Sequence, residues 1–411
     1  MDQFKFIDLF CGIGGFHQAM SSIGGSCVYA CDIDENCKKT YELNYGIRPD
    51  GDITKVDVRE IPAHDVLCAG FPCQSFSIAG KKKGFSDATR GTLFFEILRI
   101  LKFHQPKYAL LENVKNLANH DNGQTWRIIK DSLLDSGYYT FEKPIIFSPH
   151  YVGIPQNRER VYILCVRKDL SELPPFSFNI SNIPICSIEK IILEDSEIED
   201  IEKFKLSKDQ IEWINNWNEF IQNIVFDRVP PSFPIWSDTF CDMQDNPRLL
   251  NKNNLSEWVI EITSKNQELW KKNKSLCTEW LEKARRNPLF HGAKAKFEWK
   301  GKPVNGLNLW DCILQIRPSG LRAKPANYFP ALVTITSQVP IIGKRKRFLT
   351  PRECARLQSF PDSFKINENI SQAYKQFGNC VNVELIKLFA KYMFADKEIQ
   401  NRFSYNTQFA N

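Results

Sequence analysis

The hydrophobic positions of the chain fall into short apolar runs separated by turns and by segments with helical spacing. Runs at residues 4–10, 27–30, 66–69 and 108–111 are short and continuous, which predicts buried strands. Helical spacing follows at residues 92–103 and 124–136, and another apolar run at 161–166 predicts a further strand. Strands that alternate with helices along one chain indicate an α/β fold.

A glycine-rich turn, C-G-I-G-G at residues 11–15, follows the first predicted strand and opens a helix near Phe16. A strand, a glycine turn and a helix N-terminus together form a pocket of the nucleotide-binding type. The third glycine of the dinucleotide fingerprint is missing, because residue 17 is His17, and this argues against a pyrophosphate ligand. Asp32 ends the second predicted strand and can accept hydrogen bonds from ribose hydroxyls, while Asp52 can bond an adenine amino group. The pattern predicts a nucleoside cofactor.

A candidate nucleophile, Cys73, lies in the segment D-V-L-C-A-G-F-P-C-Q-S-F-S-I-A at residues 65–79. Gly70 and Pro72 end the preceding strand, so we expect Cys73 on a loop at its carboxyl end, where α/β sheets bind ligands. A lone cysteine is more often a buried packing residue than a catalytic one. The interpretation of Cys73 as a nucleophile therefore depends on the residues around it. Glu112 ends the next predicted strand at the same edge, and two reactive groups beside a cofactor turn indicate an active site.

Length, charge and cysteine content limit the number of domains and the kind of protein that the chain can be. A chain of 411 residues can hold two domains or one domain with a large insertion, and its net charge of +6 fits a nucleic-acid partner without requiring one. The 13 cysteines show no C-x-x-C pair, which favours reduced thiols over disulfides, and we expect no metal site. No apolar run approaches the roughly 18 residues of a membrane span, and the N-terminus lacks a signal-peptide pattern. We therefore expect a cytoplasmic protein without membrane association.

The sequence changes character from about residue 169. Prolines and an acidic run at 194–202 precede a region that holds eight of the nine tryptophans, and lysines and arginines crowd residues 271–302. Aromatic residues among cations can stack on nucleic acid and neutralise it. The tryptophans also fit the core of a small helical domain, and we expect this second arrangement for most of them. They stand at positions 213, 217, 236, 258, 270, 280, 299 and 310.

Six motifs stand out along the chain, namely F-I-D-L-F-C-G-I-G-G-F, C-A-G-F-P-C-Q-S-F-S, L-L-E-N-V-K-N, G-I-P-Q-N-R-E-R-V-Y, T-P-R-E-C-A-R-L-Q-S-F-P and Q-A-Y-K-Q-F-G-N-C-V. With these motifs the chain resembles the C5-cytosine DNA methyltransferases of bacterial restriction–modification systems. The motifs occur in the family's order over roughly residues 4–168 and 317–395. The segment 169–316 matches no motif and stands where this family carries its target-recognition domain.

The resemblance implies a Rossmann-like, S-adenosylmethionine-dependent methyltransferase fold, with a mixed sheet, helices on both faces and a smaller inserted recognition domain. Residues 1–168 would form the first part of the catalytic domain and residues 169–316 the recognition domain. Residues 317–411 would complete the edge of the recognition domain and return to the catalytic domain.

The resemblance also implies a mechanism. Cys73 would add to C6 of a flipped-out cytosine in a short DNA sequence, and C5 would then accept the methyl group, leaving S-adenosylhomocysteine. Glu112 would hold the base at N3 and at its exocyclic amine. Arg160, with Arg158 beside it, would bind the cytosine O2 and the cysteine loop.

Further residues would bind the cofactor and the target. Gln74, Ser77 and Lys81 would contact the target nucleotide or its phosphates. Relatives often carry tryptophan at the position of Ile33 and serine at that of Cys380, and neither departure touches the chemistry. The implied cofactor residues are Phe10, Gly12, Gly14, Gly15, Asp32, Ile33, Asp52, Ile53, Pro72, Asn379 and Val381.

The implied partner is double-stranded DNA, with a possible cognate restriction endonuclease that acts on the same site. We expect a monomer, because no coiled-coil heptad is present. A tRNA cytosine-5 methyltransferase of the same fold is one alternative, although those relatives usually carry proline in place of Phe71. A catalytically silent DNA-binding relative is the other, although Cys73, Glu112 and Arg160 are all present.

Overall fold

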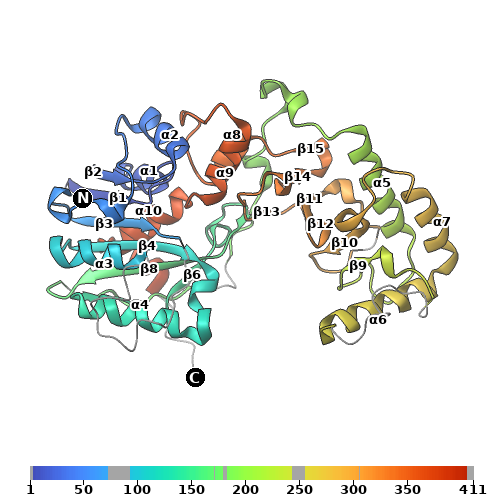
Figure 1. The fold of residues 1–411 in the computed structure, drawn as a ribbon, viewed down its shortest axis with the longest axis horizontal. Helices are drawn as coiled ribbons and strands as arrows, with labels where there is room; N and C mark the ends of the chain where they lie inside the picture. The colour runs from blue at the N-terminus through green and yellow to red at the C-terminus, as the bar shows by residue number, and fades with distance from the viewer. Residues whose placement is uncertain are drawn as a thin grey trace. The chain divides into compact units, whose positions relative to one another are not determined.

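The computed structural model of the protein describes residues 3–72, 93–170, 172–178, 183–242, 255–304 and 306–404. The chain divides into two units (Figure 1). Unit 1 comprises residues 1–187, 331–334 and 351–411, and unit 2 comprises residues 188–330 and 335–350. Unit 2 therefore begins and ends later in the chain than the predicted recognition domain at residues 169–316.

Unit 1 is built on a mixed seven-stranded sheet with the order β2-β1-β3-β4-β8-β5, in which β6 also pairs with β8. The first four strands are parallel, whereas β5 and β6 run antiparallel to β8, and β8 runs antiparallel to β4. The parallel arrangement follows from the helical connections between these strands. The bounds are β1 Phe4–Leu9, β2 Gly25–Cys31, β3 Val66–Gly70, β4 Tyr108–Val114, β5 Tyr138–Tyr139, β6 Ile145–Phe147 and β8 Arg160–Arg167.

Helices cover both faces of this sheet (Figure 1). Alternate strand residues such as Ile7, Leu67 and Ala109 share a buried core with α3 and α4, while α1 and α10 pack against each other on the other face. The prediction of a mixed α/β sheet with helices on both faces is confirmed, and so are the two predicted helices at residues 92–103 and 124–136. The helices are α1 Gly15–Ser21, α2 Glu35–Tyr45, α3 Leu93–His104, α4 Gln124–Asp135, α8 Pro351–Leu357, α9 Ile370–Asn379, α10 Val383–Met393 and α11 Lys397–Ser404.

Unit 2 packs three helices against one face of a six-stranded sheet with the order β15-β14-β11-β12-β10-β9. The expectation of a small helical domain is therefore corrected to a unit of helices and a sheet. The strands were missed because several of them are only two residues long and leave no visible alternation in the sequence. The helices are α5 Lys208–Asn223, α6 Glu257–Lys272 and α7 Lys274–Ala284. The strands are β9 Ile235–Trp236, β10 Lys296–Trp299, β11 Cys312–Arg317, β12 Gly320–Pro325, β14 Ile341–Ile342 and β15 Arg347–Phe348. Two further short strands in the chain are β7 Gln156–Asn157 and β13 Phe329–Pro330.

Most of the tryptophans of unit 2 belong to its buried core, as predicted. Six of them are no more than 6% exposed, and these are Trp213, Trp217, Trp236, Trp270, Trp280 and Trp299. Their indole nitrogens still find partners, as when Trp213 and Trp217 both donate to the carbonyl oxygen of Lys294. Trp310 is partly buried against the same core, and Trp258 has 55% of its surface exposed.

Two negative findings concern only the part of the chain that the structure describes. None of its helices combines the length and apolar character that crossing a membrane requires. Within the same residues, no group of three or more histidine, cysteine, aspartate or glutamate side chains is placed to bind a metal ion.

Candidate active site

A cavity of about 640 Å³ opens in unit 1 at the carboxyl ends of β1, β3 and β4. Its lining combines the glycine turn with residues from the far C-terminal part of the chain. Cys73, Gln74, Ser77 and Lys81 lie outside the described residues, but Phe71 and Pro72, which lead to them, line the cavity. The predicted site residues that line it are Phe10, Gly12, Gly15, Asp32, Ile33, Asp52, Ile53, Pro72, Glu112, Arg158, Arg160, Asn379 and Val381.

The glycine turn needs its glycines for two different reasons. Gly14 has a φ of 86°, and a Cβ there would collide with the ring of Tyr45, whose hydroxyl donates to the Gly14 carbonyl at 2.9 Å. Gly14 therefore supports the turn from behind and is not among the lining residues. At Gly15 a Cβ would lie 2.6 Å from Cγ2 of Val381, so this glycine lets the C-terminal segment pack directly onto the turn.

His17 occupies the position where a dinucleotide fingerprint has its third glycine. Its ring stacks on Tyr45 at 3.8 Å, and its Nδ1 lies 2.7 Å from the Tyr41 hydroxyl. Both tyrosines come from α2, so the imidazole fills the space between α1 and α2. Burial lowers the pKa of His17 to about 4, so the ring is neutral at physiological pH.

Asp32 is fixed at the end of β2 by two backbone donors. Its carboxylate accepts from the Gly12 N–H at 2.8 Å and from the Asp34 N–H at 2.8 Å. Burial raises the pKa of Asp32, while these hydrogen bonds act in the opposite direction. Each oxygen keeps a lone pair for a ligand, so the group can accept a pair of hydroxyl donors.

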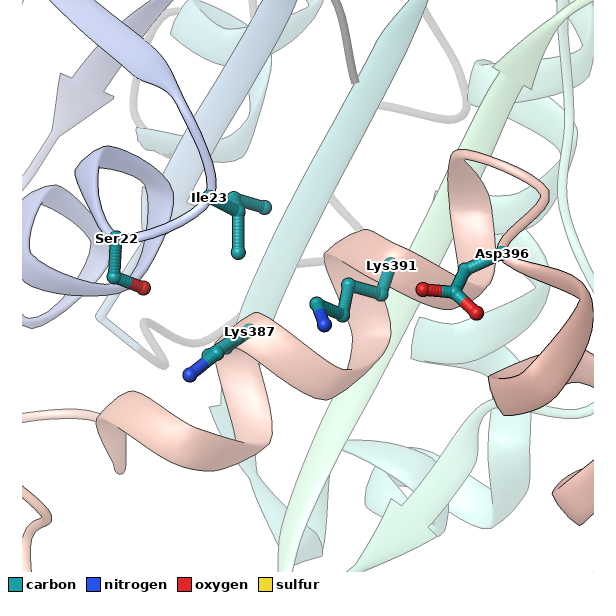
Figure 2. A pocket seen from close by; sticks show the side chains of 5 residues that line it. All are labelled: Ser22, Ile23, Lys387, Lys391 and Asp396. Atoms are coloured by element: carbon teal, nitrogen blue, oxygen red, sulfur yellow. The ribbon is translucent and has the colours of Figure 1, made fainter.

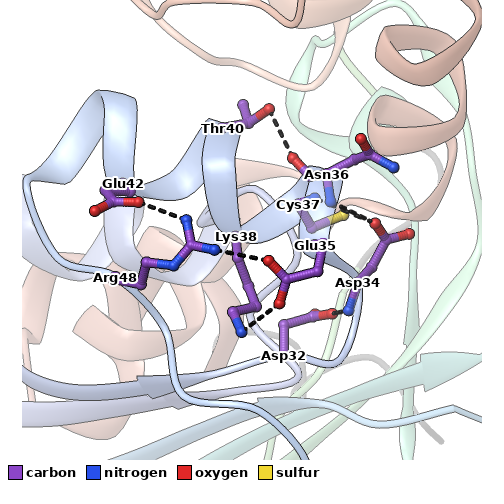
Figure 3. Close-up of polar contacts among 9 residues, drawn as sticks. All are labelled: Asp32, Asp34, Glu35, Asn36, Cys37, Lys38, Thr40, Glu42 and Arg48. Carbon is purple, nitrogen blue, oxygen red and sulfur yellow. Dashed lines mark hydrogen bonds and ion pairs between the residues drawn. The ribbon is translucent and has the colours of Figure 1, made fainter.

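The start of α2 holds Asp32 in place (Figure 3). Asp34 caps this helix by accepting from the Asn36 N–H at 2.9 Å and the Cys37 N–H at 3.3 Å. Glu35 then pairs with Lys38 at 2.6 Å and with Arg48 at 2.7 Å, on the outer side of the helix. The cap fixes the backbone that donates to Asp32.

An exposed apolar side chain stands between the two predicted acids. Ile33 lines the cavity with 76% of its surface exposed, which is unusual for an isoleucine. Asp52 accepts from the backbone N–H of Thr54 at 3.0 Å and from its hydroxyl at 2.8 Å, through the same oxygen. Ile53 beside it is buried. A flat ligand with hydroxyl and amino groups fits this combination of an apolar platform and two carboxylates.

Glu112 and Arg160, which also line the cavity, form an ion pair. Arg160 Nε lies 3.2 Å from Glu112 Oε1, because antiparallel pairing of β4 and β8 sets Arg160 opposite Val114, two residues from Glu112. Glu112 is only 8% exposed, and its burial raises its pKa, an effect that Arg160 and Arg158 partly offset. A carboxyl group in this state can exchange a proton with a bound base.

Arg158 lies close in sequence to Arg160 but has different partners. Its buried guanidinium donates to the backbone carbonyls of Leu332 at 2.9 Å, Gly378 at 3.0 Å and Cys380 at 3.0 Å. Burial, together with the neighbouring Arg160, lowers the pKa of Arg158 to about 10, so it remains charged at neutral pH. The side chain joins three segments of unit 1 that are distant in sequence.

Asn113 is a site residue that our sequence analysis did not single out. Its Nδ2 donates to the Phe71 carbonyl at 2.9 Å, and its Oδ1 accepts from the Val114 N–H at 2.8 Å. It is 2% exposed, so both polar ends are satisfied inside the protein. The only available signal was its position directly after Glu112 at a strand end.

A second cavity in unit 1, of about 450 Å³, has a different character (Figure 2). Lys387 and Lys391 from successive turns of α10 line it together with Ser22, Ile23 and Asp396. Ser22 follows the C-terminal end of α1, whereas the glycine turn precedes its N-terminal end. The five described residues that line this second cavity include none of the predicted site residues, so the first cavity is the candidate active site.

Comparison with known proteins agrees with this site. Residues 4–395 match the family model of C-5 cytosine-specific DNA methylases. The chain is 34% identical over 391 residues to the Type II methyltransferase M.HhaI of Haemophilus parahaemolyticus, covering 94% of this chain and 93% of that protein. It is also 34% identical over 401 residues to the Type II methyltransferase M.HpaII of Haemophilus parainfluenzae, covering 95% and 89%.

A solved structure supports the fold independently. The structure of a DNMT2 mutant from Spodoptera frugiperda superimposes with a TM-score of 0.52 at 20% identity, covering 95% of this chain and 99% of that one. The family model and the two relatives confirm the resemblance seen in the six motifs. The chain therefore belongs to the C-5 cytosine-specific DNA methylase family and is a DNA cytosine-5 methyltransferase.

Proposed function

We propose that this enzyme methylates a cytosine flipped out of double-stranded DNA, through a covalent bond between the Cys73 sulfur and C6 of the base. The observation that carries the proposal is the buried Glu112–Arg160 pair, 3.2 Å apart at the edge of the cavity to which Phe71 and Pro72 lead. Attack on C6 needs access to the face of the ring, so the base must leave the stack, at a cost of about a few kcal/mol.

The chemistry begins when the Cys73 thiolate forms a bond to C6, which moves an electron pair into the ring toward O2 and N3. Glu112 donates a proton or a hydrogen bond at N3, and Arg160 stabilises the charge at O2. C5 then becomes an enamine-like carbon that takes the methyl group. A base from solvent then takes the C5 proton, and the electron pair of that C–H bond re-forms the C5=C6 double bond. The bond from C6 to sulfur breaks, which releases Cys73 as a thiolate, and N3 returns to Glu112 any proton it received.

The family implies S-adenosylmethionine as the donor, which supplies a methyl group activated by a sulfonium. The residues of the cavity fit such a group. Asp32 has free lone pairs for the ribose hydroxyls, Ile33 offers an exposed apolar surface to the adenine, and Asp52 offers a carboxylate to its amino group. Asn379 and Val381 line the same cavity from the C-terminal side.

We further propose that unit 2 is the target-recognition domain, and that Gln74, Ser77 and Lys81 contact the target nucleotide or its phosphates. Support comes from the position of unit 2, which is inserted between the motif-bearing segments of unit 1. The net charge of +6 favours binding to a polyanion. Similarity to Type II methyltransferases supports a cognate restriction endonuclease as a partner. A tRNA substrate is not favoured, because the matching family model is that of DNA methylases.

Bisulfite sequencing of a plasmid from a methylation-free host that expresses the protein tests this proposal. We expect protected cytosines in one short sequence context. Cys73→Ser should abolish the protection, whereas Cys241→Ser, which changes a partly exposed cysteine of unit 2, should retain it. Protection by the Cys73→Ser protein would contradict the covalent mechanism. An absence of protection with soluble wild-type protein would contradict the DNA substrate.

A further inference from the structure

The sheet of unit 2 has two unlike faces. Leu321 lies beside Phe297, and Ala323 lies opposite Leu314, and all four side chains belong to the buried core. Successive residues of a strand point to opposite faces of the sheet, so the strand neighbours of these core residues point away from the core. The opposite face carries four cations and one carboxylate on β10, β11 and β12, namely Lys296, Arg317, Arg322, Lys324 and Glu298. We call these five residues the cationic face.

The carboxylate of the cationic face is already neutralised. Arg322 Nε donates to Glu298 Oε2 at 2.8 Å, and Lys300 Nζ lies 2.7 Å from Glu298 Oε1. These contacts hold the Arg322 side chain in place. Among the described residues, neither Arg317 nor Lys296 has a carboxylate within ion-pairing distance. The face therefore has an excess of positive charge.

Lys324 is an unusual lysine. It is only 8% exposed, and its ammonium lies 3.4 Å from the centre of the Tyr328 ring. Burial, with Arg322 nearby, lowers its pKa to about 7. A buried ammonium beside another cation is unfavourable for folding, and an anion bound at this face would relieve the repulsion.

Two tryptophan rings lie near Lys296 of the cationic face, the buried Trp236 of β9 and the exposed Trp258 of α6. Trp236 stands opposite Lys296 in the sheet, and the Lys296 ammonium lies 5.9 Å from its ring. Trp258 stands edge-on to Trp236 at 5.6 Å and is 55% exposed. Aromatic rings beside cations are typical of surfaces that bind nucleic acids.

We propose that the cationic face binds the sugar–phosphate backbone of duplex DNA, with the partly exposed Lys296, Arg317 and Arg322 facing phosphates and the buried Lys324 adding positive charge behind them. This inference rests on the proposed role of unit 2 as the recognition domain and adds the surface it uses. Neighbouring strands lie about 4.8 Å apart, so the cations form a band across three strands rather than a single point charge. A rigid band of charge positions the duplex, while sequence must be read by other residues.

Salt-dependent binding tests the cationic face. The probe is a fluorescent duplex that carries the methylated sequence identified by bisulfite sequencing, beside a scrambled duplex, and anisotropy is measured from 50 to 300 mM NaCl. Arg317→Gln and Lys324→Gln should each weaken binding to both duplexes and reduce the slope of log K against log salt by about 1. Arg317→Lys keeps the charge and should restore the slope.

Lys283→Gln serves as the matched control, because Lys283 is an exposed lysine of α7 that pairs with Glu219. It should leave the slope unchanged. Slopes for Arg317→Gln and Lys324→Gln equal to that of the control, in variants with wild-type thermal stability, would overturn the inference. If Lys324→Gln does not fold, Arg317→Gln decides alone. A wild-type protein that methylates no DNA would instead contradict the proposed function, so the two failures are distinguishable.

Discussion

Asn113 Nδ2 donates a hydrogen bond to the backbone carbonyl of Phe71 at 2.9 Å, which ties the end of β4 to the segment that leads to Cys73. The same residue follows Glu112 directly in the chain. One buried amide therefore joins the strand that carries the acid to the segment that leads to the nucleophile. We regard Asn113 as a positioning residue, since it reaches the reaction only through the Phe71 backbone.

Replacing Asn113 with alanine should lower kcat by about 10- to 100-fold, because small misplacements of a reacting group are costly. The affinity for S-adenosylhomocysteine should stay close to that of the wild type, since Asn113 does not hold Asp32 or Ile33. Single-turnover methylation and calorimetry measure the two effects. Asn116→Ala is the control, because Asn116 is an exposed asparagine three residues further along the chain. An unchanged kcat in Asn113→Ala would contradict the positioning role.

Arg158→Lys should destabilise unit 1 by about 2–4 kcal/mol, because lysine keeps the charge but cannot reach the three carbonyls that the guanidinium fork binds. The affinity for S-adenosylhomocysteine should fall about tenfold, or by ~1.4 kcal/mol, since Gly378 and Cys380 flank the cavity residue Asn379. Denaturant unfolding and calorimetry give the two values. Arg127→Lys, on the exposed side of α4, should change neither.

Glu112 should give the enzyme a distinctive pH dependence. Burial raises the pKa of its carboxyl from an ordinary 4.5, so the protonated form persists to higher pH than in a free glutamate and is lost as pH rises through the raised value. The rate of methyl transfer should therefore carry a component that decreases with rising pH, opposed by formation of the Cys73 thiolate. Glu112→Gln should remove that component and lower the rate by about 10²- to 10³-fold. Single-turnover rates from pH 5 to 9 test this, and an identical pH profile in the variant would exclude Glu112 as the proton donor.

Ile33 offers a gain-of-affinity test. Its side chain is 76% exposed at the cavity, so Ile33→Trp costs little packing and adds a ring that can stack on adenine. Stacking of this kind is worth about 0.5–1.5 kcal/mol, so S-adenosylhomocysteine should bind about 2- to 10-fold more tightly. Ile185→Trp, at a fully exposed position of unit 1, controls for nonspecific effects of a surface tryptophan. Equal or weaker binding by Ile33→Trp would show that the adenine lies elsewhere.

The architecture of unit 1 could be predicted from the sequence, because its reactive and ligand-binding residues come directly after buried parallel strands. Asp32 and Glu112 lie at the carboxyl ends of parallel strands. Because these ends meet at one edge of the sheet, the sequence alone places both residues beside one cavity. The partners of Asn113 and Arg158 could not be predicted from the sequence. Both side chains bind backbone carbonyls, which every residue type carries. The partner of Arg160 depends on the antiparallel direction of β8, and strand direction cannot be recognised from an apolar run.

Unit 2 was harder to predict for a different reason. Its tryptophans indicated a buried core correctly, but β9, β14 and β15 contain only two residues each and therefore have no periodicity. The alternation in β12, where Leu321 and Ala323 face the core and Arg322 and Lys324 face away, is visible in the sequence only once the strand is known. The basic residues at 271–302 were evident from the sequence, but of these only Lys296 lies on the cationic face. Its other cations, on β11 and β12, were not singled out.

The packing of Gly15 against Val381 has a consequence for biosynthesis. A ribosome makes the glycine turn among its first residues and Val381 only after more than three hundred others, yet the two are in contact in the finished cavity. The cavity is therefore incomplete on a nascent chain, and Arg158 finds its partners Gly378 and Cys380 only near the end of synthesis. Prematurely terminated chains that lack this last segment would therefore be released with an incomplete cavity.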